Sequence, residues 1–181
     1  MEWLLLLFFL PFFLTLMFFN WLEERFYSFR DVEKLGEGEV LLSEKNYPEA
    51  LTFFTEKLKL FPKSSKAYYF RGKSNLHLEN YFSALYDIEQ SISYDNTVPE
   101  HFVLKGKILY KLEEFDKAFL EFDKADWFYR SGNAETLRWR GMSRYLIGQV
   151  ENAIIDFKRA VELGDEDADY ILKTKFEYMR K

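Results

Sequence analysis

Residues 72–88 read GKSNLHLENYFSALYDI and residues 106–122 read GKILYKLEEFDKAFLEF, so glycine, alanine and a large apolar residue recur in the same order 34 residues later. The same positions can be followed through four units of the chain. The glycines are Gly38, Gly72, Gly106 and Gly141, the alanines twelve residues further on are Ala50, Ala84, Ala118 and Ala153, and the apolar residues after these are Phe54, Ile88, Phe122 and Phe157. A fixed period of roughly 20 to 50 residues predicts a chain built from stacked structural repeats.

Each unit has the pattern of two helices joined by a turn. Apolar residues recur at helical spacing, as in Leu85, Ile88 and Ile92, and a polar break such as Glu79-Asn80 separates the two halves. A single helical hairpin cannot bury its apolar face, so neighbouring units are expected to stack into a solenoid. The phased glycines and alanines predict the places where helices cross most closely.

Residues 31–167 resemble the tetratricopeptide-repeat (TPR) family. In that family a small residue occupies the eighth position of each repeat, an aromatic the seventeenth and alanine the twentieth. The repeats predicted from this resemblance are 31–64, 65–98, 99–132 and 134–167. They diverge from the family pattern, since the small residue of the twenty-seventh position is Lys57 in the first repeat and the closing proline occurs only as Pro62. The resemblance implies an all-α TPR solenoid whose first helices line a concave protein-binding face.

A basic residue precedes three of the phased glycines, and an acid follows each of them after sixteen residues. The pairs are Arg71 and Asp87, Lys105 and Glu121, and Arg140 and Asp156. The constant spacing predicts that each pair lies within about 4 Å and joins the two helices of one repeat. Taken as exposed ion pairs, they are each expected to contribute only about 0.2–1 kcal/mol.

The segment after the fourth repeat has the features of a terminal cap. Gly164 is suited to end a helix, and the acids from Asp165 to Asp167 are suited to begin the next one. Repeat arrays need a terminal unit with a polar outer face. Residues 168–181 are therefore predicted to form a capping helix.

The amino-terminal segment from Trp3 to Leu22 contains twenty residues without a charge, almost all of them Leu, Phe, Met or Trp. About 20 such residues span a bilayer, so residues 1–22 are predicted to be a single transmembrane anchor and residues 23–30 a juxtamembrane linker. A cleaved signal peptide is the rival interpretation, but the segment lacks a basic start and a small-residue cleavage site.

The orientation of the anchor follows from the basic residues beside it. Arg25, Arg30 and Lys34 come after the span and no basic residue precedes it. Because basic residues favour the cytoplasmic side, we expect a single-pass membrane protein with its repeats in the cytoplasm. The opposite orientation would make it an exported protein that acts on the outer side of the membrane.

The composition excludes several classes of function. The net charge of −5 disfavours nucleic acid as a partner. The chain has no cysteine, and its two histidines, His77 and His101, do not have the spacing of metal ligands. No glycine-rich phosphate or dinucleotide motif is present. We therefore expect no enzyme activity, no cofactor, no bound metal and no small-molecule substrate.

The partner-binding residues implied by the resemblance lie on the first helices of the repeats. They are Lys66, Tyr69, Lys73, Lys107, Tyr110, Lys111, Arg138, Met142 and Tyr145. With their neighbours they give a groove of five basic and three acidic residues, which favours an acidic peptide or helix carrying an apolar anchor. A solvated inner face without a dedicated partner is the other interpretation.

Two functions remain open from the sequence. The first is a membrane-anchored adaptor that binds a protein partner on its concave face. The second is an accessory structural subunit of a larger membrane complex. A chaperone adaptor is disfavoured, because the positions that carry Lys and Asn in chaperone-binding TPR domains hold residues such as Leu35, Glu39 and Leu104 here.

Overall fold

The structure is a computed structural model that describes residues 11, 13–19, 21 and 35–176. Residues 13–19 are helical. Outside the described residues lie most of the first half of the predicted anchor, the predicted linker 23–30 and the first four residues of the predicted first repeat. Within the residues that are described, no helix is long and apolar enough to cross a membrane.

Helices follow one another from residue 36 to residue 176, and the described part of the chain contains no strand. The helices, in chain order, are α2 (Gly36–Ser43), α3 (Tyr47–Leu60), α4 (Ser65–His77), α5 (Tyr81–Tyr94), α6 (Pro99–Lys111), α7 (Phe115–Tyr129), α8 (Ala134–Leu146), α9 (Val150–Glu162) and α10 (Glu166–Ile171). The predicted all-α solenoid is confirmed.

Local sequence signals set the ends of these helices. The side chains of Ser64, Asn133 and Asp165 accept hydrogen bonds from backbone N–H groups in the first turns of α4, α8 and α10, as expected for residues that favour the N-cap position. Within each repeat, the turn between the two helices contains one residue with a positive φ. These residues are Lys45, Glu79, Glu113 and Gly148, at φ of 60°, 61°, 62° and 83°.

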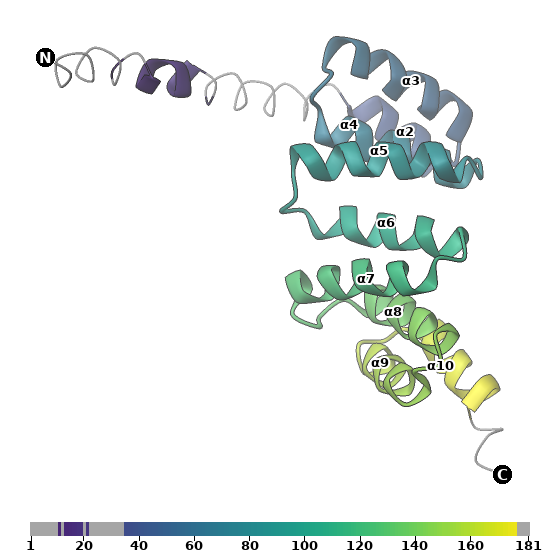
Figure 1. The fold of residues 1–181 in the computed structure, drawn as a ribbon. Helices are drawn as coiled ribbons and strands as arrows, with labels where there is room; N and C mark the ends of the chain where they lie inside the picture. The colour runs from purple at the N-terminus through teal and green to yellow at the C-terminus, as the bar shows by residue number, and fades with distance from the viewer. Residues whose placement is uncertain (1–10, 12, 20, 22–34, 177–181) are drawn as a thin grey trace, which may run out of the picture.

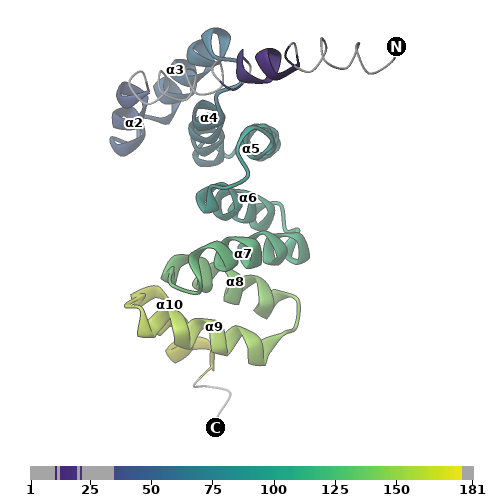
Figure 2. The same cartoon turned by 90° about the vertical axis from the view of Figure 1, so that its left-hand side faces the viewer.

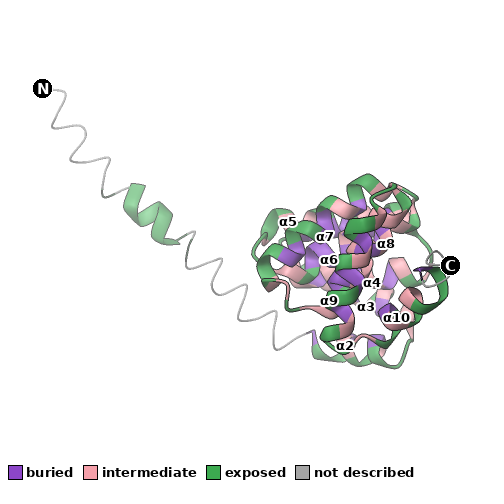
Figure 3. Cartoon of the chain, turned by 90° about the horizontal axis from the view of Figure 1, so that it is seen from below, coloured by how far each residue is buried: buried purple, intermediate pink, exposed green. Residues whose placement is uncertain are grey.

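The helices form two layers. Helices α2, α4, α6 and α8 contact one another in succession, while α3, α5 and α7 each also contact the helix that follows in the next repeat. Figures 1 and 2 show the repeats stacked one after another from α2 to α10. Seen along the stack, the buried residues lie between the layers and the exposed ones around the outside (Figure 3). The direct contacts between α4, α6 and α8 make these helices the inner layer.

The phased residues meet at the crossing of the two helices within each repeat. The four phased alanines are completely buried. A Cβ atom on Gly106 would lie 2.6 Å from the ring of Phe122, and one on Gly141 would lie 2.9 Å from the ring of Phe157. Gly38 faces Phe54 in the same way, and Gly72 faces the backbone of Ala84 and the Cβ of Asp87. The apolar residue four positions after each alanine therefore packs at the site of the glycine in three of the repeats.

The three predicted ion pairs are confirmed. The guanidinium of Arg71 lies 2.6 Å from Asp87, Lys105 Nζ lies 3.8 Å from Glu121, and Arg140 Nη2 lies 2.8 Å from Asp156. The expectation that they are exposed was wrong. Asp87 and Asp156 are only 1% and 2% exposed, so each acid depends on its basic partner.

Arg140 and Lys105 also join one repeat to the preceding one. Arg140 Nη1 lies 2.7 Å from Asp126 and 2.9 Å from Asp123, both on α7. Lys105 Nζ lies 3.0 Å from Glu89 on α5, closer than its predicted partner Glu121. These residues therefore fix how successive repeats stack as well as how two helices pair.

The predicted cap packs against the last repeat. Helix α10 begins at Glu166 and continues as a π-helical turn over Leu172–Phe176. Ala168 is completely buried, and Phe176 packs against Phe157 and Tyr145 at ring-centroid distances of 5.8 and 5.4 Å. The residues after 176 lie outside the described part of the chain.

Candidate functional site

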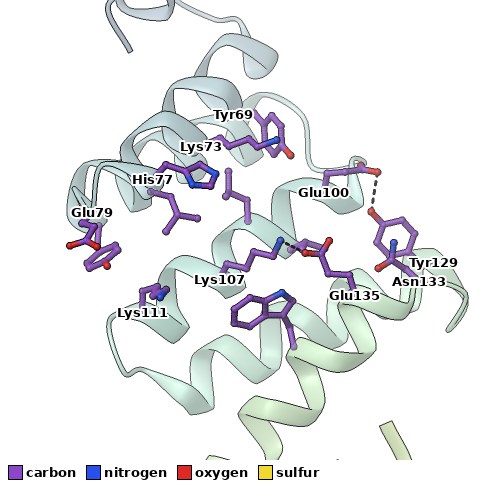
Figure 4. A pocket seen from close by; sticks show the side chains of 15 residues that line it. Tyr69, Lys73, His77, Glu79, Glu100, Lys107, Lys111, Tyr129, Asn133 and Glu135 are labelled. Atoms are coloured by element: carbon purple, nitrogen blue, oxygen red, sulfur yellow. Dashed lines mark hydrogen bonds and ion pairs between the residues drawn. The ribbon is translucent and has the colours of Figure 1, made fainter. Parts of the chain in front are cut away.

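A cavity of about 470 Å³ opens on the inner layer between α4, α6 and α8 (Figure 4). Its floor is apolar and includes Leu76, Val103, Leu104 and the ring of Trp139. The polar residues around it are Tyr69, Lys73, His77, Glu79, Tyr81, Glu100, Lys107, Lys111, Tyr129, Asn133 and Glu135. The cavity spans the second, third and fourth repeats, so its shape depends on their stacking.

One end of the cavity holds two carboxylates close to tyrosine hydroxyls. Tyr129 donates a hydrogen bond of 2.9 Å to Glu100, and Lys107 Nζ lies 2.6 Å from Glu135 (Figure 4). Burial, together with the charges of Glu100 and Glu135, raises the pKa of Tyr69 to about 12. Burial opposes ionisation of Glu135, but its contact with Lys107 holds the pKa of this carboxyl below its ordinary value.

Two lysines of the cavity are unpaired. Lys73 and Lys111 form no ion pair with any of the described residues. His77 stacks on Tyr47 with 4.2 Å between ring centroids. Partial burial lowers the pKa of His77, and the nearby charges of Lys73 and Lys107 lower it further. Both effects favour the neutral imidazole, so the lysines supply the positive charge near His77.

Among the described residues no cluster of three or more His, Asp or Glu side chains could hold a metal ion. The cavity instead offers an apolar floor with hydrogen-bonding and charged groups around its edge. Such a surface can bind a ligand through apolar contact, with charges that fix its orientation.

No protein-family model matches the chain. It is 34% identical over 86 residues to Hsp70-Hsp90 organizing protein 1 from Glycine max. The matched segment covers 48% of this chain and 15% of that protein. It is 33% identical over 93 residues to the TPR repeat-containing protein MJ1428 from Methanocaldococcus jannaschii, covering 51% and 16%. The matched regions thus span about one sixth of the length of these curated relatives.

Solved structures match a larger share of the chain. YrrB, described as a TPR protein with an unusual peptide-binding site, superposes with a TM-score of 0.68 at 21% identity over 85% of this chain and 84% of that one. MamA superposes with a TM-score of 0.65 at 20% identity over 76% and 74%. The first TPR of Spaghetti (RPAP3), solved bound to the HSP90 peptide SRMEEVD, gives 0.61 at 18% identity over 65% and 94%. The chain has the TPR fold.

Four of the nine predicted partner-binding residues line this cavity of the TPR solenoid: Tyr69, Lys73, Lys107 and Lys111. The charge balance differs from the expected basic excess. Three lysines face three glutamates, and Lys107 is already paired with Glu135. The cavity therefore carries balanced charge instead of the basic excess expected of the groove.

The other five predicted residues do not line the cavity. Lys66 pairs with Glu39 on the neighbouring first helix, at 2.5 Å, and Arg138 binds Asp165 and Asp167 at the start of the cap, at 3.0 and 3.3 Å. The remaining three are covered by aromatic neighbours or the cap: Tyr110 by Phe115 and Trp139, Tyr145 by Phe176, and Met142 by the hydrophobic cluster around Phe157.

Several side chains of the cavity come from positions outside the predicted groove, and three of them are informative. Tyr129 ends α7, Asn133 caps α8, and Trp139 lies in the middle of α8 with its ring stacked on Phe122 at 6.1 Å. Tyr129 and Asn133 belong to the connection between repeats. The groove was predicted only from positions on the first helix of each repeat, so it did not include them. Trp139 is an aromatic residue on a first helix, and that signal could have found it.

The two histidines give a pH dependence that can be measured. Burial lowers the pKa of His101, although its contact with the Asp95 carbonyl opposes this, and the pKa of His77 is lowered as well. The pKa of an unfolded histidine is about 6.5, so near and below that pH the unfolded state binds more protons than the folded state. We expect the free energy of unfolding to fall as the pH drops from 7 through this range.

The measurement is a ¹H–¹³C NMR titration of the two imidazoles, combined with urea unfolding at pH 7 and pH 5.5. His77→Gln identifies the resonance of His101 and is expected to leave most of the pH dependence in place, because His101 is the more deeply buried of the two. A midpoint for His101 at or above the unfolded value would contradict this account.

Proposed function

We propose that this chain is a non-catalytic TPR module that binds a segment of a protein partner in the cavity between α4, α6 and α8. The observation that carries the proposal is the cavity itself, in which an apolar floor is surrounded by charged groups from three repeats. Lys73 and Lys111 have no ion-pair partner among the described residues and so remain available to a ligand. Peptide complexes of the same fold, such as that of Spaghetti with an HSP90 peptide, support the proposal.

A chaperone peptide is not the partner that we propose. The similarity to Hsp70-Hsp90 organizing protein extends over 15% of that protein. Chaperone-binding TPR domains hold a carboxylate with Lys and Asn side chains. Two of the corresponding positions here are occupied by Leu35 and Leu104, which are 1% and 5% exposed. Buried leucines cannot bind a carboxylate.

We further propose that residues 3–22 anchor this module in a membrane, with the repeats on the cytoplasmic side. The support is the uncharged run of twenty residues between two tryptophans and the basic residues that follow it. The expected result is that the full chain stays in the membrane fraction after an alkaline carbonate wash and that deletion of residues 1–22 releases it. Retention of the truncated chain would contradict the anchor.

The experiment for the binding function is purification of the full chain in mild detergent, followed by identification of the proteins recovered with it. Lys73→Glu combined with Lys111→Glu is expected to reduce recovery of the partner at least tenfold, because both reversals replace an unpaired lysine of the cavity by an acid. The matched control is Lys63→Glu with Lys158→Glu, which makes the same change in net charge at exposed positions away from the cavity. Equal recovery with both double variants would contradict binding in the cavity.

A second candidate function is favoured by the outer layer of helices. Phe82 on α5 and Trp127 on α7 are 78% and 75% exposed, and Tyr86 is also exposed. Exposed aromatic residues of this size are common at protein interfaces. A structural subunit of a membrane complex would use this face, and its partner would be lost on Phe82→Ser and Trp127→Ser but not on reversal of the cavity lysines.

A further inference from the structure

The charges of the cavity are separated along helix α6. Glu100 lies in the first turn of this helix and Lys111 in its last turn. Eleven residues at a rise of about 1.5 Å place these positions about 16 Å apart along the helix axis. Figure 4 shows Glu100 and Glu135 on one side of the cavity and Lys111 and His77 on the other. A ligand in the cavity therefore meets opposite charges at its two ends.

The end around Glu100 carries excess negative charge. Glu100 and Glu135 both face the cavity there, and Lys107 balances only one of them through its 2.6 Å contact with Glu135. The hydroxyl of Tyr129 binds Glu100 as a neutral donor and leaves its charge in place. Burial raises the pKa values of Tyr69 and Tyr129, and Glu100 adds to both shifts.

The opposite end holds Lys111, with His77 and Glu79 on the same side, while Lys73 lies one helical turn from Tyr69 and extends toward it (Figure 4). Within the described part of the chain neither lysine is paired, whereas Lys66 and Arg138 on the same face each have an acidic partner. Like charge from Lys73 contributes to the lowered pKa of His77. A carboxylate of the ligand can therefore bind Lys111 at this end.

The wall between the two ends is apolar. Val103 and Leu104 are 8% and 5% exposed, and Leu76 and the indole of Trp139 complete this surface. Lys107 extends over the Trp139 ring, with its Nζ 5.7 Å from the ring centroid, and thereby covers part of it. A ligand that follows α6 would make apolar contacts at its centre and ionic contacts at its ends.

We propose that the partner segment is an extended peptide with charges of both signs. It carries a carboxylate that binds Lys111, an apolar side chain over Leu76 and Trp139, and a lysine or arginine that binds Glu100 and Glu135. An extended chain rises about 3.3 Å per residue, so the acid and the base lie about five residues apart. This inference rests on the proposed binding function. It replaces the acidic partner expected from the sequence with one whose opposite charges also fix its direction in the cavity.

The test is selection of random twelve-residue peptides displayed on phage against the full chain, immobilised in detergent micelles. The peptides recovered are expected to share an acid and a base four to six residues apart, in one fixed order, with an apolar residue between them. A reversed variant combines Lys73→Glu and Lys111→Glu with Glu100→Lys and Glu135→Lys. It is expected to select the opposite order and to bind the original peptides at least tenfold more weakly.

Circular dichroism shows whether the reversed variant retains its helices, and Lys63→Glu with Lys158→Glu is expected to select the same peptides as the unchanged protein. Synthetic peptides with free and amidated C-termini distinguish a side-chain carboxylate from a terminal one. Peptides that carry only acids, or an order that stays the same in the reversed variant, would overturn this inference while leaving cavity binding intact. Recovery of no peptides, or of peptides that bind all variants equally, would instead overturn the proposed function.

Discussion

Replacing Asp156 by alanine is expected to lower the free energy of unfolding by about 3–5 kcal/mol. Asp156 is 2% exposed and lies 2.8 Å from Arg140 and 2.7 Å from Arg144. The free-energy cost of removing these three charged groups from water is offset by their contacts, and these contacts need the carboxylate of Asp156. Alanine would leave Arg144 half-buried beside Phe119 without an acid, and Arg140 would keep only its partners on α7.

The measurement is equilibrium urea unfolding of the purified protein, followed by circular dichroism. The matched control on the same helix is Glu162→Ala, which removes the exposed pair with Arg159 and is expected to cost no more than about 1 kcal/mol. Equal losses for the two variants would mean that the Asp156 contacts do not contribute as buried ion pairs.

Replacing Phe122 by alanine is expected to cost about 3–5 kcal/mol, because the side chain is completely buried and leaves a cavity. The ring also occupies the space beside Gly106, where an added Cβ would approach to 2.6 Å. Gly106→Ala alone is therefore expected to cost about 1–3 kcal/mol. In the Phe122→Ala background the same methyl group would enter the cavity, and the cost of Gly106→Ala is expected to disappear.

A double-mutant cycle measured by urea unfolding tests this coupling. Gly36→Ala is the control for adding a methyl group, since a Cβ there would meet nothing within 4 Å, and Phe82→Ala is the control for removing an exposed ring. Additive effects of Gly106→Ala and Phe122→Ala would contradict direct packing between these two positions.

The sequence predicted the features that repeat within each unit. Gly106 contacts Phe122 and Arg140 contacts Asp156, in each case between the two helices of one repeat. Because both partners lie within a single 34-residue period, the repeat spacing alone could predict these contacts. Burial of Asp156 was not predicted, because the spacing identifies a contact between two side chains but not how much water is excluded from it.

Contacts between repeats and with the cap were harder to predict. Lys107 meets Glu135 across 28 residues, a pairing that depends on how the third and fourth repeats stack. Tyr145 was expected in the groove, but Phe176 of the cap packs on it, and the divergent sequence of the cap has no periodic signal that would indicate this contact. The basic residues of the groove could be assigned from the repeat, whereas their neutralisation by Glu39, Glu135 and Asp165 required the three-dimensional structure.

Photo-crosslinking tests most directly whether the partner binds in the cavity of the inner layer. The photoreactive residue p-benzoylphenylalanine is introduced at Leu76, which lines the cavity, or at Phe82, which is exposed on the outer helix α5. Each variant of the full chain is irradiated in the cells that produce it. The account predicts a crosslinked partner from position 76, lost on Lys73→Glu with Lys111→Glu, and none from position 82. A partner crosslinked from position 82 and not from position 76 would contradict it.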